Sequence, residues 1–561
     1  MPFLALILTW FTGLAVGTPQ APATGGSSPR AHAALAYTTA ALSAPIASHA
    51  SATSALPAPA APPTSPLALP SAAELPATPT RATPNVLVIL LDDVGCERLR
   101  PFGQGAPYAR TPVLQSLAAR GVTFTNCYSN PLCGPTRALL QTGRYAFRTG
   151  FGPNIFPNYQ FGLNHLETCL PELLRDGFAP GPSPYVSGAF GKWHISMYVD
   201  TTHPNDCGFG HFAGCMTNVS DQSELFGTFY HNYHWRKVVD GVESIVGTPD
   251  GPYSERQWAG SVQARDAAEW MLAQTQPFFA QLAFNPPHAP YQVPPFSLIS
   301  PASRNAIEAL GVEQIGVPYG EGDFAWITDL THPTRPITEE QLRRKKLLFY
   351  DAMLEATDLN IGDVLARIEP KLADTMIFLL SDNGPESSVV DPARYDPNRA
   401  KRTCYQLGVH VPLIVVGPMV STPGRRVDHP VGVVDLWRTI RDVTGAREVP
   451  GMIPSDVVID SRSFLPYLAD PNAPLGRRYA FSEVFNPIGN PANMSLGARQ
   501  RMITDGRWKL VRTGLDDIEE LYDLATDPRE IQNLLPSSNT TIKAHRDELA
   551  LELDSLIYSD G

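Results

Sequence analysis

The sequence predicts an α/β fold with a mostly parallel central β-sheet between helices. Continuous apolar runs, typical of strands buried on both faces of such a sheet, occupy residues 86–91, 278–284 and 376–380. The three runs are far apart in the chain, so helices must connect them. We therefore expect βαβ units and one large sheet.

Two helices are predicted between these strands. Thr111 and Pro112 begin the first, and Gly121 ends it before a short strand at 122–124. The second begins near Thr338 and leads into the strand at 376–380. Its predicted buried side is formed by Tyr350, Met353, Leu354, Thr357, Ile361 and Leu365.

The C-terminal part of the chain predicts a smaller α+β domain with an antiparallel sheet. A hairpin with an Asp505-Gly506 turn spans 501–511, and a closing helix from about Ile542 to Ile557 should pack on the sheet. We place the large domain at 85–478 and the C-terminal subdomain at 479–561.

The N-terminal segment predicts export. Residues 3–16 form one apolar run followed by small residues, so 1–17 is predicted to be a signal peptide. No Lys or Arg precedes the run, and a retained anchor is the alternative. Residues 18–84 are rich in Ala, Pro, Ser and Thr, which predicts a disordered tether. We expect a periplasmic or secreted protein with no stable membrane span.

The charge and the cysteines restrict the class of protein. The 561-residue chain has a formal net charge of −12, which argues against nucleic-acid binding because phosphate backbones would be repelled. An anionic substrate must then be held by a local cluster of cations. Seven cysteines do not make a disulfide scaffold, and Cys207 with Cys215 is the easiest local pair to imagine.

Cys133 is the candidate nucleophile. Pro135 suits a first helical position, so Cys133 should lie just ahead of a helix whose free N–H groups favour anions. Arg137, one turn further on, adds positive charge. A disulfide bond at Cys133 is the alternative in an exported protein.

Oxygen-bearing side chains follow two of the predicted strands. Asp92 and Asp93 close the first apolar run, and Asp382 and Asn383 follow the run at 376–380. Open α/β sheets place their ligands at such strand ends, and adjacent carboxylates repel each other unless a cation is bound. Three carboxylates and an amide, with no His or Cys in the set, favour calcium or magnesium over zinc or copper. A helix N-cap or a solvated turn is the alternative for Asp92-Asp93.

Three further segments carry candidate site residues. Lys192 and His194 alternate in G-K-W-H, so both would point to one side of an extended segment. His288 lies between prolines in a rigid loop after the strand at 278–284. Lys401 precedes another apolar strand. Taken alone, each of these residues is more often structural or exposed than catalytic.

Together the motifs resemble the type I, cysteine-type sulfatases. The signature C-x-P-T-R, followed by Thr142-Gly143-Arg144, comes first, and G-K-W-H, P-H-x-P, S-D-N-G and Lys401 follow in the family order. The resemblance covers about 85–534 and implies an alkaline-phosphatase-like fold with a mixed, mostly parallel sheet. It implies a hydrolase that cleaves an aryl or carbohydrate sulfate monoester to an alcohol and inorganic sulfate. The flanks of Cys133 look closest to the arylsulfatase B branch.

The resemblance also implies a role for each residue. A formylglycine-generating maturation enzyme would oxidise Cys133 to Cα-formylglycine, which would share the calcium with Asp92, Asp93, Asp382 and Asn383. His194 would help hold the nucleophile, and His288 would protonate the leaving alcohol. The sulfuryl oxygens would be neutralised by Arg137, Lys192 and Lys401.

One segment departs from the family pattern, which is roughly K-G-[TS], then a glutamate and glycines, then R-V-P. Gln406, Leu407 and His410 stand where the Glu, a Gly and the Arg are usual. Two other functions stay open. A phosphonate monoester or phosphodiester hydrolase of the same superfamily tends to carry histidine where this chain has Asn383. A non-catalytic binder of sulfated glycans, displayed on the tether, is the other.

Overall fold

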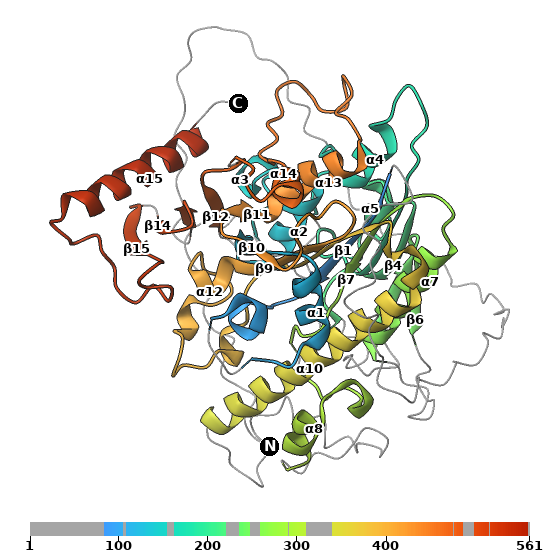
Figure 1. Ribbon diagram of the computed structural model, residues 1–561, viewed down its shortest axis with the longest axis horizontal. Coiled ribbons are helices and arrows are strands. Elements are labelled where there is room, and N and C mark those ends of the chain that lie inside the picture. The colour runs from blue at the N-terminus through green and yellow to red at the C-terminus, as the bar shows by residue number, and fades with distance from the viewer. Residues whose placement is uncertain are drawn as a thin grey trace, which may run out of the picture. The chain divides into compact units, whose positions relative to one another are not determined.

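The large sheet of the protein has a mixed, mostly parallel arrangement, as the sequence predicted (Figure 1). In the part of the chain that the structure describes, eleven strands join in the order β10-β2-β9-β8-β1-β7-β3-β4-β5-β6, with β11 paired to β2. The strands are β1 Asn85–Leu91, β2 Val122–Tyr128, β3 Val186–Lys192, β4 His211–Cys215, β5 Trp235–Val239, β6 Val242–Val246, β7 Phe278–Ala283, β8 Thr375–Ser381, β9 His410–Val416, β10 Arg425–Val427 and β11 Val431–Gly432.

The computed structural model describes residues 83–104, 108–153, 162–219, 235–246, 258–289, 291–309, 339–474, 476–485, 499–514 and 516–558. All of them belong to one compact unit of the chain. The predicted signal peptide and all but the last two residues of the predicted tether lie outside them. Within these ranges, none of the helices combines the length and the apolar character that crossing a membrane requires.

Four parallel strands at the centre of the sheet end at the same edge. β1 lies between β8 and β7, and β3 lies on the other side of β7. Leu91 pairs with Ser381, and Ala283 pairs with both Leu90 and Gly191. Because the register aligns the four carboxyl ends, the residues that follow these strands are brought together.

Helices cover both faces of the sheet, and strand β1 shows why. Its side chains alternate, so Leu87, Ile89 and Leu91 pack on one face, while Val86, Val88 and Leu90 pack on the other. The first face is covered by α1 Pro112–Arg120, α7 Ala259–Ala273 and α10 Glu339–Arg367. The second is covered by α2 Cys133–Thr142, α4 Leu170–Asp176 and α13 Leu436–Thr444. Both predicted helices, α1 and α10, are confirmed.

Shorter helices connect these elements. The α-helices are α3 Ala146–Thr149, α5 His203–Asp206, α8 Pro301–Glu308, α11 Glu369–Leu372, α12 Gln406–Val409 and α14 Leu465–Ala469. Single 3-10 turns lie at Cys96–Arg98, Arg100–Phe102, Phe296–Leu298, Ser387–Val389, Pro397–Arg399 and Val433–Asp435.

A second, antiparallel sheet forms the C-terminal part, as predicted. It contains β12 Ala480–Val484, β13 Gln500–Thr504, β14 Trp508–Thr513 and β15 Ile518–Asp523, in that order. Helix α15 Thr540–Tyr558 packs on one face through Leu549 and Leu553. The other face packs against Leu132 and Cys404. The small sheet thus supports two segments that carry candidate site residues.

Two local predictions were wrong. Helix α2 begins at Cys133 itself, because the N–H of Thr136 already donates to Leu132 O at 3.2 Å. Pro135 is tolerated there since the first N–H groups of a helix have no intrahelical partner. Cys207 and Cys215 form no disulfide, and all seven cysteines are free. The Cys215 thiol instead donates to Asn285 Oδ1 at 3.5 Å.

His410, one of the residues that depart from the family pattern, stabilises an irregular stretch of the sheet. The pairing of β2 with β9 shifts register between Phe124 and Cys127. Within that stretch the Thr125 carbonyl accepts a hydrogen bond from His410 Nε2 at 2.6 Å, and Gln104 Nε2 donates to His410 Nδ1 at 3.0 Å. Both ring nitrogens are used by a neutral imidazole, and burial lowers the pKa of His410 to about 4.

This histidine makes the protein less stable in acid. Unfolded histidine takes up a proton near pH 6.5, whereas folded His410 does so only near pH 4, so its stabilising contribution is lost as the pH falls through that window. Between pH 7 and pH 4.5, wild-type protein should lose about 2 kcal/mol more unfolding free energy than His410→Gln. Denaturant unfolding at both pH values measures this, with His165→Gln as the control, and equal losses would contradict it.

Candidate active site

The predicted site residues converge at the carboxyl edge of the four central strands. Asp92 and Asp93 follow β1, Asp382 and Asn383 follow β8, and His288 lies in the loop after β7. Lys192 is the last residue of β3. Cys133 comes from a different element, the first turn of α2. The convergence of these side chains follows from the strand register, because each segment leaves the sheet beside its neighbour.

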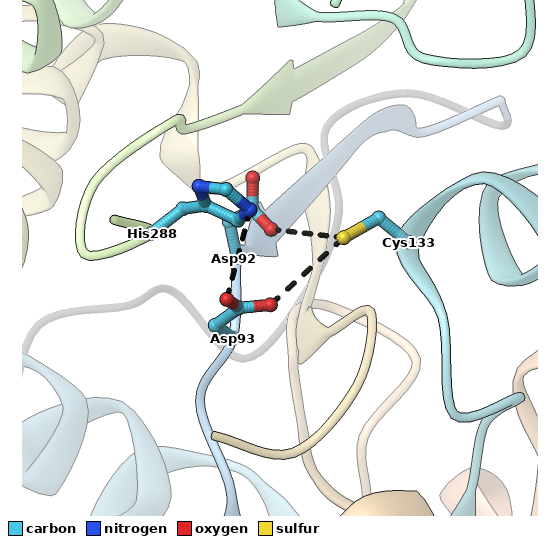
Figure 2. A group of neighbouring side chains, drawn as sticks. All are labelled: Asp92, Asp93, Cys133 and His288. Carbon is cyan, nitrogen blue, oxygen red and sulfur yellow. Dashed lines mark hydrogen bonds and ion pairs between the residues drawn. The ribbon is translucent and has the colours of Figure 1, made fainter. Parts of the chain in front are cut away.

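Figure 2 shows the centre of this cluster, with Asp92, Asp93, Cys133 and His288 facing one another. Each offers one ligand atom that lies within 4.8 Å of those of the others. The Cys133 thiol donates to Asp92 Oδ1 at 3.4 Å and contacts Asp93 Oδ1 at 3.9 Å. His288 Nε2 lies 3.8 Å from Asp93 Oδ2. Two carboxylates therefore flank the candidate nucleophile.

The two strand ends are joined by direct hydrogen bonds. The backbone N–H of Asp93 donates to Asp382 Oδ1 at 3.2 Å, and Asn383 Nδ2 donates to Asp93 Oδ1 at 2.7 Å. Asp93 adopts a left-handed backbone conformation with φ of 64°, which is costly for a residue with a side chain. The Tyr350 hydroxyl on α10 donates to the Asp93 carbonyl at 2.8 Å and helps to hold this turn.

Three buried cations balance the three carboxylates. Lys192 Nζ lies 2.5 Å from Asp92 Oδ2, and Lys401 Nζ lies 2.7 Å from Asp93 Oδ1. Arg137 Nη2 donates to Asp382 Oδ2 at 2.8 Å, and its Nη1 donates to the carbonyl of Lys192 at 2.7 Å. Each acid has a basic partner, so the formal charges of the six groups cancel. Such pairing is what allows charged groups to remain buried.

Burial and these charges set the protonation of the cluster. Burial would raise the pKa of Asp93, but the positive charges of Lys401 and His288 hold it below its usual range. Burial and the neighbouring Asp92 raise the pKa of Asp382 to about 6. Burial, together with the charge of Lys401, lowers the pKa of His288 to about 4.

The Cys133 thiol is a poor nucleophile in this setting. Burial, and after it the negative charge of Asp382, raise the pKa of the thiol well above its ordinary value. The reactive form of cysteine is the thiolate, which this environment disfavours. If residue 133 is the nucleophile, its reactivity must come from a group other than the free thiolate.

The oxygens of the cluster fit a hard divalent cation. Asn383 Oδ1 is buried and accepts no hydrogen bond from any residue that the structure describes. A buried acceptor without a donor is costly, and a bound cation would satisfy it. Carboxylate and amide oxygens from Asp92, Asp93, Asp382 and Asn383 are the donors that calcium and magnesium prefer.

The structure departs from the prediction at G-K-W-H. Lys192 joins the cluster, but His194 has a left-handed φ of 63°, so the extended alternation ends at Trp193. Trp193 is buried, and its Nε1 donates to His203 Nδ1 at 3.3 Å. His194 is also buried, directly after this anchored residue.

Sequence reasoning missed several residues that support the site. Gln263 on α7 clamps the loop of His288, because its Nε2 donates to Asn285 Oδ1 at 2.6 Å and its Oε1 accepts from the Asn285 N–H at 3.3 Å. His288 Nδ1 in turn donates to the Ala289 carbonyl at 2.7 Å, which leaves Nε2 on the side of Asp93. A glutamine inside an amphipathic helix gives no signal of such a role. Tyr350 was predicted only as a buried helix residue.

Two family models and several known proteins match the chain. A family model described as sulfatase matches residues 84–446, and one described as N-sulphoglucosamine sulphohydrolase, C-terminal, matches 398–557. The arylsulfatase of Klebsiella aerogenes is 29% identical over 431 residues, 64% of this chain and 87% of the relative. The steryl-sulfatase of Mus musculus is 29% identical over 446 residues, 70% of this chain and 66% of the relative.

A solved structure supports the fold. It is a protein in complex with its substrate, D-glucosamine-2-N,6-O-disulfate, and it superposes with a TM-score of 0.60. The match covers 84% of this chain and 97% of that protein at 22% identity.

The oxygen cluster should bind a divalent cation that stabilises the fold. Calcium at a hundred times its dissociation constant should add about 2.7 kcal/mol of stability, and a chelator should remove this gain. Asp382→Asn, which removes one negative charge with little change in shape, should reduce the response. Thermal unfolding with and without calcium measures both effects. The exposed Asp396→Asn is the control, and an unchanged response in Asp382→Asn would contradict the assignment.

Proposed function

The chain is a member of the sulfatase family, and from this premise we propose that it hydrolyses an aryl or carbohydrate sulfate monoester through a formylglycine at position 133. The products would be an alcohol and inorganic sulfate. The observation that carries this proposal is the position of Cys133, between two carboxylates that are paired with three buried cations. A bound divalent cation would add positive charge to this balanced set, and the site would then fit a small anion such as a sulfate ester.

The environment of residue 133 favours a modified nucleophile. Because burial keeps the Cys133 thiol protonated, a hydrated aldehyde produced there by a formylglycine-generating enzyme is the better candidate. It supplies two hydroxyl groups, one to take up the sulfuryl group and one whose loss of a proton releases sulfate as the C=O bond reforms. A serine or a thiol has only one such position and no equivalent exit.

A cation would be held by Asp92, Asp93, Asp382, Asn383 and the oxygen of residue 133. When bound, calcium, or magnesium as the second choice, supplies positive charge that lowers the pKa of the attacking hydroxyl and neutralises a sulfuryl oxygen. Asn383 Oδ1 supports this ligand set, because it is buried and accepts no hydrogen bond from the described residues.

Three cationic side chains of the protein would stabilise the charge on the sulfuryl group. Arg137, Lys192 and Lys401 would hold the sulfuryl oxygens and offset charge as the sulfur–oxygen bond breaks. Their carboxylate partners hold them in place before substrate binds. His194, two residues after Lys192, would help hold the nucleophile.

His288 would act as the general acid. Its Nε2 faces Asp93 at 3.8 Å, next to the nucleophile segment. Burial lowers its pKa to about 4 in the protein alone, but the negative charge of a bound sulfate ester favours the protonated ring. The proton would pass from Nε2 to the alcohol oxygen as its bond to sulfur breaks.

One residue favours sulfate esters over phosphonate or phosphate esters as the substrate. Asn383, where related phosphonate monoester and phosphodiester hydrolases tend to have histidine, favours sulfate esters. The relatives' names include an arylsulfatase and a steryl-sulfatase, so family membership alone does not select the alcohol. We also propose that the segment at 1–17 directs export to the periplasm or out of the cell.

A comparison of a sulfate ester with a phosphonate ester tests the reaction class. Purified protein should release sulfate from 4-nitrophenyl sulfate with a kcat/KM at least about a hundredfold above that for a phenylphosphonate monoester, since the site is proposed to be complementary to sulfate transfer. Release of both acids is measured under the same calcium concentration. A preference for the phosphonate would overturn the proposal in favour of the related hydrolase.

The role of His288 predicts a dependence on the leaving group. His288→Ala should lower kcat on poorly leaving alkyl or sugar sulfates about 10²- to 10⁴-fold, and far less on 4-nitrophenyl sulfate, whose phenolate needs no proton. A plot of log kcat against leaving-group pKa should therefore become steeper in the variant. Parallel plots for variant and wild type would remove His288 from the acid role.

A further inference from the structure

Glu386 extends the charge network of the site toward solvent. It lies three residues after Asn383, at the start of the turn Ser387–Val389. Lys401 Nζ, already paired with Asp93, lies 3.4 Å from Glu386 Oε1. Arg402 then binds both oxygens of Glu386, with Nη2 to Oε1 at 3.0 Å and Nη1 to Oε2 at 3.1 Å. The four side chains form a line of alternating charge.

Exposure rises along this line, from the buried cluster to the surface. The exposed fraction of the side chain is 1% for Asp93, 2% for Lys401, 16% for Glu386 and 53% for Arg402. His288, the proposed acid, contacts the same Asp93 from which the line starts. An alcohol that takes its proton from His288 must reach solvent, and this line leads there. Glu386 and Arg402 are therefore placed to contact the alcohol part of the substrate.

Arg402 is held in a backbone conformation that favours glycine. Its φ is 77°, in the left-handed region, which is unfavourable for a residue with a side chain. Its N–H donates to the Pro131 carbonyl at 2.9 Å, just ahead of Cys133, and the Lys401 N–H donates to Pro385 at 3.0 Å. An arginine kept in a strained position beside an active site indicates a role for its side chain.

The chemistry of the pair indicates the kind of group it binds. The charges of Glu386 and Arg402 cancel, so the pair offers little net attraction for a second anion. It does offer charged acceptors and donors side by side. Hydroxyl groups both donate and accept hydrogen bonds, so a ring that carries several of them fits such a pair, whereas a steroid or a plain phenol does not.

We propose that Glu386 and Arg402 are specificity-determining residues that bind hydroxyl groups of the alcohol, and that the preferred substrate is a sulfate ester of a carbohydrate. This inference rests on the proposed function and narrows it. The pair lies outside the set that holds the sulfuryl group, so it acts on substrate choice and not on the transfer of the sulfuryl group itself.

The test compares two substrates in matched variants. Arg402→Gln keeps a polar, flexible side chain but loses the charge, and Arg402 has its ion pair with Glu386 and not with Lys401. Sulfate release from 4-nitrophenyl sulfate and from a panel of monosulfated monosaccharides is measured for wild type, Arg402→Gln and Glu386→Gln. Arg304→Gln, which removes a surface ion pair with Glu308 on α8, is the control for loss of an arginine.

For the best sugar sulfate, kcat/KM should fall at least about tenfold in Arg402→Gln and Glu386→Gln, as expected for lost hydrogen bonds to charged groups. On 4-nitrophenyl sulfate Arg402→Gln should stay within about threefold of wild type, because Arg402 pairs with Glu386 and not with Lys401, and Arg304→Gln should match wild type on both substrates. Equal losses of Arg402→Gln on both substrates, or no loss on either, would overturn the inference.

Assays of the wild-type enzyme distinguish a failure of this inference from a failure of the proposed function. Turnover of 4-nitrophenyl sulfate without turnover of any sugar sulfate would overturn the substrate class and leave the sulfatase proposal standing. Failure to release sulfate from either kind of ester, with formylglycine present, would overturn the proposed function itself.

Discussion

The pairing of three buried carboxylates with three buried cations is the interaction on which the rest of the site depends. Any one of these charges, left alone in the interior, would cost several kcal/mol. Asp92, Asp93 and Asp382 need the cations to stay ionised, and ionised carboxylates are what a calcium ion requires. In the proposed reaction the same cations would hold the sulfuryl group. One electrostatic arrangement would thus stabilise the site and serve the proposed reaction.

The fold supplies the alignment that this pairing needs. Four parallel strands, β8, β1, β7 and β3, end in register at one edge of the sheet, so residues from distant parts of the chain meet there. The C-terminal sheet adds support, since one of its faces packs on Leu132 and Cys404, next to the segments of Cys133 and Lys401. The small sheet therefore helps to hold the segment of Cys133 in place.

The sequence predicts the parts of this architecture that local pattern controls. Apolar runs followed by oxygen-bearing residues identified the strands β1 and β8 and the side chains at their ends, because periodicity and strand ends are local signals. What it could not predict depends on tertiary contacts. The start of α2 is set by a bond to Leu132, and the turn at His194 ends the extended alternation. Arg402 and Glu386 are 16 residues apart in the chain, and no spacing rule joins them.

The central claim is that residue 133 acts as formylglycine, and mass spectrometry of the tryptic peptide 121–137 tests it most directly. The peptide also contains Cys127, which serves as an unmodified control. Preparations that differ in maturation should contain different aldehyde fractions at residue 133, and sulfate release should rise in proportion to that fraction. Activity that is independent of the aldehyde fraction, or that survives Cys133→Ala, would contradict the account.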